Sequence, residues 1–272
     1  MSVIDEDEIE KFGEEITLRA GKIIRERFGD PSSLDIRNKR PADYVTDVDL
    51  ASEALIVGEI GKRFPAHHVM AEESSRGGLG EGITWVVDPL DGTTNFIHGF
   101  PFVAVSIGVC VAGRVECGFV YDPLRDELFK AVRGKGAHLN GKRFQIRKGA
   151  PLGEALVATG FPYHIRWAVG PYLETFGEVL VQVSGLRRAG SAALDLAYTA
   201  FGRVDGFWEL GLKAWDVAAG SLLVEEAGGT VSDFWGRANF LGNGHIVAGS
   251  DAVYPCLMSA VGKHLAPVLK EG

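Results

Sequence analysis

The stretch WVVDPLDGTTNF, residues 85–96, changes character abruptly in its middle. An apolar run that is typical of a buried strand ends at Val87, and two acidic residues, Asp88 and Asp91, follow at once. Two carboxylates this close repel each other, so burial would raise one pKa sharply unless a cation compensates. Pro89 fixes φ and stiffens the turn between them. The stretch therefore predicts a rigid group of oxygen ligands where a strand ends.

The atoms of this turn suit a divalent cation bound next to a phosphate group. Carboxylates, together with the carbonyl oxygen of Leu90, are the hard ligands that Mg²⁺ prefers. Gly92 lets the backbone approach a ligand closely. The N–H groups of Gly92, Thr93 and Thr94 could hold a phosphate if they open a helix or a nest.

Two further acids stand where they could join this site. Glu72 follows a short apolar run, and Asp216 lies at the start of a helical run. Taken alone, Glu72 is most simply a surface acid, and Asp216 is an ordinary helix cap, because helix N-termini favour negative charge. The pair Asp88 and Asp91 is the reason to consider both as metal ligands.

Hydrophobic periodicity predicts a mixed order of helices and strands. Helices are expected over 7–28, 49–64, 167–180, 192–201 and 215–227, and Ser191 can cap the helix over 192–201. Strands are expected over 69–71, 84–87, 102–111, 114–121, 127–132, 155–159, 204–209 and 246–249. Asn140-Gly141 is typical of a hairpin turn, and residues 31–44 are expected to form a loop.

Mixed antiparallel strands with helices indicate an α+β fold built in layers. We expect one compact unit with two halves, 1–150 carrying the acidic turn and 151–272 carrying Glu209 and Asp216, with the boundary near residues 145–155.

The composition is that of an ordinary globular protein, with 272 residues, 46% hydrophobic and 24% charged. A net charge of −8 argues against a nucleic-acid surface, which usually needs a basic excess. The acidic first ten residues lack the apolar core of a signal peptide, and the longest apolar stretch is too short to span a bilayer. We therefore expect a cytoplasmic protein that binds neither membrane nor nucleic acid.

Four separate segments, in this order along the chain, resemble the inositol monophosphatase family. They are DYVTDVD at 43–49, AEES at 71–74, WVVDPLDGTTNF at 85–96 and AWDVAAG at 214–220. The resemblance extends over nearly the whole chain. It implies the layered α/β sandwich of the sugar phosphatases, which inositol monophosphatases share with fructose-1,6-bisphosphatases, and it implies a homodimer.

The family pattern also implies a set of metal ligands. Asp88 would bridge two Mg²⁺ ions, and Glu72 and the Leu90 carbonyl would complete the protein shell of the first. Asp91 and Asp216 would hold the second. A third, weaker ion would lie near Glu72, and Mn²⁺ could substitute for Mg²⁺.

Catalytic and substrate-binding residues follow from the same resemblance. Asp49 would pair with the Thr93 hydroxyl to orient or deprotonate the attacking water, and Glu72 belongs with them. Substrate would be bound by Asp91, Gly92, Thr93, Thr94, Ala192, Glu209 and Asp216. Glu209 would accept hydrogen bonds from ring hydroxyls and Ala192 would lie beside the ring; the alternative for Glu209 is an exposed acid at a strand end. Arg187 and Arg188 could face a substrate or a subunit interface.

These residues predict Mg²⁺-dependent hydrolysis of myo-inositol monophosphate and related sugar or polyol phosphate monoesters by water. Two ions about 3.5–4 Å apart can clamp the attacking and leaving oxygens of an in-line displacement, and no Cys or Ser nucleophile motif suggests a covalent intermediate. Resemblance also implies inhibition by Li⁺. Two alternatives stay open: a fructose-1,6-bisphosphatase or other small-molecule phosphatase of the same fold, and a regulatory binding protein with incidental phosphatase activity.

Overall fold

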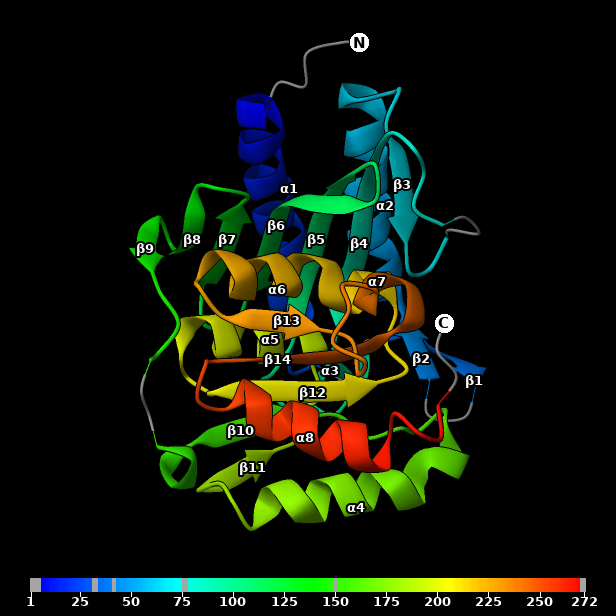
Figure 1. Ribbon diagram of the computed structural model, residues 1–272. Helices are drawn as coiled ribbons and strands as arrows, with labels where there is room; N and C mark the ends of the chain where they lie inside the picture. Colours follow the sequence, from blue (N-terminus) through cyan, green and yellow to red (C-terminus); the bar gives the residue numbers. More distant parts are fainter. Residues whose placement is uncertain (1–5, 31–33, 41–42, 75–77, 149–150, 270–272) are drawn as a thin grey trace.

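The computed structural model describes residues 6–30, 34–40, 43–74, 78–148 and 151–269. Helices and sheets alternate in layers (Figure 1). The long helices are α1 (Glu6–Arg27), α2 (Asp47–Arg63), α4 (Val169–Leu180), α5 (Ala192–Phe201), α6 (Ala214–Glu226) and α8 (Tyr254–His264). The expected layered α+β fold is confirmed. None of the helices in these ranges is long and apolar enough to cross a membrane.

A seven-stranded sheet forms the first of the two β layers. Its strands, in spatial order, are β3 (His68–Ala71), β4 (Ile83–Asp91), β5 (Ala104–Val111), β6 (Arg114–Asp122), β7 (Glu127–Val132), β8 (Gly136–Leu139) and β9 (Lys142–Phe144). β3 and β4 are parallel and the other neighbours are antiparallel. The predicted turn at Asn140-Gly141 joins β8 to β9, and both residues have positive φ, as this hairpin type requires. α1 and α2 pack on one face of this sheet and α6 on the other (Figure 1), which explains why β4 and β5 are buried along almost their whole length.

A five-stranded sheet forms the second β layer. Its spatial order is β11 (Gly185–Arg187), β10 (Leu156–Thr159), β12 (Gly206–Leu210), β14 (His245–Gly249) and β13 (Thr230–Ser232). α5 and α6 lie between this sheet and the first one, and α4 and α8 cover its outer face (Figure 1). The first sheet ends at Phe144 and the second begins at Leu156; the division of the chain into two halves stays a prediction.

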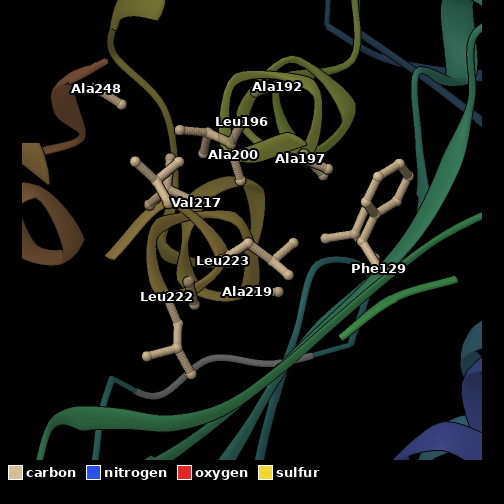
Figure 2. Packing of buried hydrophobic residues seen from close by; sticks show 14 of the residues in the cluster. Phe129, Ala192, Leu196, Ala197, Ala200, Val217, Ala219, Leu222, Leu223 and Ala248 are labelled. Carbon is tan, nitrogen blue, oxygen red and sulfur yellow. The ribbon is translucent and has the colours of Figure 1, made fainter. Parts of the chain in front are cut away.

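The central helix pair is packed with small side chains. Figure 2 shows Leu196 and Ala200 of α5 facing Val217 of α6, all three fully buried. α6 also lies unusually close to the seven-stranded sheet, where Gly108 and Gly118 pair across β5 and β6. A Cβ on Gly118 would lie 2.7 Å from the carbonyl oxygen of Ala219. Only glycine allows this approach, and it brings the N-terminus of α6 to the end of β4.

The sequence-based assignment was wrong in three places. Residues 31–44 were expected to be a loop, but β1 (Ile36–Arg40) and β2 (Asp43–Thr46) pair as an antiparallel hairpin; residues 31–33 and 41–42 lie outside the described residues. α8 was missed, as were the short elements β8, β9, β11, β13, α3 (Thr93–Ile97) and α7 (Phe240–Asn243), although the turn between β8 and β9 was predicted. β4 does not stop at Val87 but continues to Asp91. Short or polar strands carry little periodicity of their own and form because a neighbouring strand pairs with them.

Candidate active site

The acidic turn at the end of β4 is a β-bulge. Asp88 pairs with Ser106 and Asp91 with Ala104, so β4 uses three residues where β5 uses two. The Asp88 side chain is buried, and its Oδ1 accepts the Leu90 N–H at 3.0 Å. The bulge therefore turns the acids and the Leu90 peptide towards the end of the sheet while β4 remains paired with β5.

Asp49 and Thr93 form the pair that the resemblance implies. α2 begins with a capping box in which Thr46 and Asp49 exchange hydrogen bonds. The remaining oxygen of the fully buried Asp49 carboxylate, Oδ1, accepts the Thr93 hydroxyl at 2.8 Å. Thr93 Oγ1 also lies 3.1 Å from the Leu90 carbonyl oxygen. Burial raises the pKa of Asp49, against its hydrogen bonds from Thr46 and Thr93.

Two further residues of α2 support the site and were not predicted from the sequence. Ser52 Oγ donates to the Pro89 carbonyl at 2.8 Å, which holds the centre of the bulge. Glu53 Oε2 accepts the Glu73 N–H at 2.8 Å, which fixes the backbone directly after Glu72. Both side chains are buried. Their spacing from Asp49, by three and four residues, places them on the same face of the helix and could have identified them.

Gly92 connects the bulge to α3. Its φ of 92° is the left-handed region, and a Cβ there would lie 2.9 Å from the Phe102 carbonyl oxygen. The first helical hydrogen bond runs from Phe96 N–H to Gly92 O at 2.9 Å. The N–H groups of Thr93 and Thr94 precede it and have no partner within the helix.

Asp216 has the first of the two roles that the sequence left open, that of a helix cap. It is the third residue of α6, and its Oδ2 accepts the Lys213 N–H at 2.6 Å, so it caps the helix. Asp91 is held in a similar way, because its Oδ2 accepts both Ser191 Oγ and the Ala193 N–H at 2.7 Å. Ser191, the predicted cap of α5, thereby links that helix to the bulge.

The acids strongly influence one another. Burial raises the pKa of Asp88 well above its ordinary value, and Glu72, Asp91 and Asp216 raise it further by repulsion. Burial also raises the pKa of Asp91 to about 6. Burial, and then repulsion by Asp91, raises the pKa of Asp216 well above its ordinary value. Such a cluster is unfavourable as anions unless positive charge is supplied.

The donor set fits hard divalent cations. Asp88 Oδ2, Asp91 Oδ1 and Asp216 Oδ1 accept no hydrogen bond from the described residues, and the Leu90 carbonyl keeps a second lone pair. Within the described ranges, no three His, Cys, Asp or Glu side chains are already closed around one metal-sized point. Each Asp here is held by one oxygen while the other is left for a ligand, which is the chemistry that Mg²⁺ selects.

A cavity of about 1100 Å³ opens above these acids. Of the predicted site residues, all but the buried Asp49, Asp88 and Leu90 line it. The bulge, the start of α5 and the segment from β12 to α6 thus meet at one cavity, although the bulge precedes the other two by about a hundred residues or more.

Glu209 is half-buried in the cavity wall, so it is not the exposed strand-end acid that was the alternative. Burial raises its pKa to about 8, although Arg188 acts in the opposite direction. A Cβ on Gly160 would lie 1.9 Å from the Glu209 carboxyl carbon, so the glycine provides the space in which this carboxyl group lies. Arg188 lines the cavity and stacks on Phe161 and Tyr163, at 5.6 and 5.1 Å from the ring centres.

Comparison with known proteins agrees with the geometry. A family model described as "Inositol monophosphatase family" matches residues 5–266. The Nus factor SuhB of Pseudomonas aeruginosa is 48% identical over 256 residues, covering 92% of this chain and 94% of the relative. The inositol-1-monophosphatase of Mesorhizobium japonicum is 44% identical over 252 residues, covering 92% and 94%. The crystal structure of the extragenic suppressor protein suhB from Bartonella henselae matches with a TM-score of 0.89 at 40% identity, covering 94% of this chain and 99% of that one.

Proposed function

The chain belongs to the inositol monophosphatase family, and from that premise we propose that it hydrolyses myo-inositol monophosphate and related sugar or polyol phosphate monoesters. The observation that carries the proposal is the meeting of Asp88, Asp91 and Asp216, each with one oxygen left for a ligand, beside the Asp49–Thr93 pair.

Two or three Mg²⁺ ions, or Mn²⁺ in their place, would be held by Glu72, Asp88, Asp91, Asp216 and the Leu90 carbonyl. When bound, these ions would supply the positive charge that a phosphate monoester needs in an otherwise acidic cavity. The chain itself supplies the anchoring, since Ser191, Ala193 and Lys213 fix one oxygen of Asp91 or Asp216 and so orient the other.

Thr93 and Asp49 would activate the attacking water. The Thr93 hydroxyl donates to Asp49 Oδ1, so its oxygen presents a lone pair for a proton of water. As water attacks phosphorus, the bond between phosphorus and the ester oxygen breaks, and Thr93 Oγ1 takes that proton and passes its own to Asp49 Oδ1. The raised pKa of Asp49 favours acceptance of this proton. The ester oxygen leaves with the bonding electron pair and takes a proton from water to give the alcohol.

The rest of the cavity would hold the substrate. The N–H groups at the start of α3, from Gly92 to Thr94, would bind phosphate oxygens. Glu209 and Ala192 also line the cavity, and there Glu209 would hydrogen-bond the hydroxyl groups of the alcohol. This arrangement supports a polyol ester over an apolar one.

Phosphate release over a substrate panel tests the proposal. The panel contains inositol 1-phosphate, glycerol 2-phosphate, fructose 1,6-bisphosphate and histidinol phosphate, each with Mg²⁺, Mn²⁺, Mg²⁺ plus Li⁺, or chelator. We expect Mg²⁺-dependent turnover that Li⁺ inhibits and chelator abolishes, with inositol 1-phosphate preferred. A preference for fructose 1,6-bisphosphate would move the assignment to that alternative, and full activity in chelator would exclude the mechanism.

A second candidate is a regulatory binding role. It is favoured by the relatives whose name is Nus factor SuhB. The Asp88→Asn variant separates the two functions: in cells that depend on this chain, a variant without phosphatase activity that still supports growth shows that binding is the required function. We further propose a homodimer and a cytoplasmic location.

A further inference from the structure

The segment Gly211–Lys213 connects β12 to α6 and thereby sets the distance between Glu209 and Asp216 in the wall of the cavity. It leaves β12 two residues after Glu209 and enters α6 three residues before Asp216. Any shift of this short connection changes the position of Glu209, Asp216 or both. What fixes the connection therefore matters for the site.

All three backbone N–H groups of this connection are hydrogen-bonded. Lys213 N–H goes to Asp216, as described above. Leu212 N–H donates to the Gly244 carbonyl at 2.9 Å, and Gly211 N–H donates to Nδ1 of His245 at 3.2 Å. Two of the three anchors thus come from the start of β14, more than thirty residues further along the chain.

His245 is itself held firmly. Its side chain is 7% exposed, and its ring stacks on Phe234 with centres 5.3 Å apart. Its backbone N–H donates to Asn243 Oδ1 at 3.0 Å, and Asn243 Nδ2 donates to Asp233 Oδ2 at 2.9 Å. The ring therefore has one orientation, with Nδ1 facing Gly211.

The connection is packed closely against Ile165 and against the residue before β14. Gly211 has φ of 79°, and a Cβ there would lie 2.5 Å from Ile165 Cδ1. A Cβ on Gly244 would lie 2.1 Å from the Leu212 carbonyl oxygen, so the β14 corner and the connection are in close contact. Burial lowers the pKa of His245, although Asp233 acts in the opposite direction, and the neutral ring can accept at Nδ1.

Resting on the proposed function, we propose that His245 is a positioning residue for this active site. Its Nδ1 fixes the connection Gly211–Lys213 and thereby the spacing of Glu209, which faces the alcohol, and Asp216, which faces the metal ions. Without the acceptor, the half-buried Gly211 N–H loses the partner that His245 supplies, and the connection shifts to restore a hydrogen bond. Both substrate selection and metal affinity then fall together, because this one segment joins β12, which carries Glu209, to α6, which carries Asp216.

Two variants separate the acceptor from the ring. His245→Phe keeps an aromatic ring against Phe234 but has no acceptor. His245→Asn loses the ring but keeps an acceptor, because Asn Oδ1, like His Nδ1, is two bonds from Cβ. The readouts are Mg²⁺ affinity by calorimetry, the melting temperature, and the ratio of kcat/KM for inositol 1-phosphate to that for para-nitrophenyl phosphate, which has no ring hydroxyls.

For His245→Phe we expect about 10-fold weaker Mg²⁺ binding and about a 10-fold fall in the kcat/KM ratio. His245→Asn should stay within about 3-fold of the wild type in both. A His245→Phe variant that only lowers the melting temperature, or a His245→Asn variant that loses as much as Phe, overturns the proposal.

Other outcomes are also decisive. If His245→Phe does not fold, His245→Leu replaces it; if neither folds, the Asn variant alone decides, since loss of Mg²⁺ affinity there contradicts the role of the acceptor. If the wild type releases no phosphate from either ester, the proposed function fails, while the Mg²⁺ titrations still test His245.

Discussion

Residues 88–94 form one wall of the cavity, which we call the bulge wall. Its acids and hydroxyls are held by residues close to them in sequence and by one face of α2. In the wall formed by residues 209–216, which we call the helix wall, Glu209 and Asp216 are positioned by β14, Gly160 and the packing of α6. Both walls carry carboxylate side chains.

The two walls differ in how far apart in the sequence the residues lie that fix their geometry. A bulge, a proline and a left-handed glycine within five residues shape the bulge wall, and α2 and the start of α5 hold it in place. The helix wall depends on a helix approaching a sheet over Gly108 and Gly118 and on a corner of a different strand. We therefore expect substitutions in the bulge wall to act on chemistry and those in the helix wall to act on spacing.

The largest effect is expected for Asp88→Asn. Loss of the charged ligand should lower kcat by at least about 10²–10³-fold, yet the ligand-free protein should melt at the same or a higher temperature, because repulsion with Glu72, Asp91 and Asp216 is removed. The gain in melting temperature on adding Mg²⁺ should disappear. Assays of phosphate release and thermal scans with and without Mg²⁺ check this. A variant that still gains stability from Mg²⁺ would show that Asp88 is not a ligand.

Thr93→Ala tests the bulge wall without removing a proposed metal ligand. We expect kcat to fall by about 10²–10⁴-fold with little change in KM, because the hydroxyl between water and Asp49 is lost. Asp49→Asn should cause a similar loss, and the double variant little more, since the pair acts as one unit. Thr93→Ser keeps the hydroxyl and is the matched control. Losses that multiply in the double variant would mean that the two residues act independently.

Gly118→Ala tests the helix wall at a distance from the cavity. The new methyl group would press on the backbone of Ala219, so we expect a loss of about 1–3 kcal/mol in unfolding free energy. Mg²⁺ affinity should fall as well, because α6 carries Asp216. The control is Gly58→Ala on exposed α2, where nothing lies within 4 Å and a gain of roughly 0.5–1 kcal/mol is expected. Unchanged Mg²⁺ affinity in a destabilised Gly118→Ala would show that α6 can move without moving Asp216.

The smallest effect is expected for Glu209→Gln. Selection for inositol 1-phosphate over glycerol 2-phosphate, measured as the ratio of kcat/KM, should weaken, while Mg²⁺ dependence and Li⁺ inhibition stay nearly unchanged. A constant ratio would remove Glu209 from the substrate site.

The same variant has an expected pH signature. The folded, ligand-free protein keeps a proton on Glu209 up to about pH 8, whereas the unfolded chain releases it near 4.5. The wild type should therefore lose stability relative to Glu209→Gln as pH rises through this window. Thermal scans between pH 5 and 9 measure the difference, and parallel curves would contradict the raised pKa.

The sequence by itself determined which acids and hydroxyls stand in the bulge wall and that the chain turns there. The order Asp88-Pro-Leu-Asp-Gly-Thr restricts the backbone strongly enough to predict this turn, and the metal and phosphate contacts stay predictions. It also determined the cap of α5 at Ser191 and the hairpin at Asn140-Gly141, since caps and turns are encoded by a few adjacent residues.

Tertiary structure alone decided the rest. Nothing local to Gly160 or His245 marks them as parts of a site, and only the spacing from Asp49 indicates Ser52 and Glu53, because each acts on a backbone or carboxyl group that comes near only after the layers have packed. The strand at residues 36–40 and the extension of β4 past Val87 likewise exist because a neighbouring strand pairs with them. Asp216 shows both influences: its own sequence made it a helix cap, and only the close approach of α6 to the seven-stranded sheet placed it beside Asp88, where burial and repulsion raise the pKa of both acids.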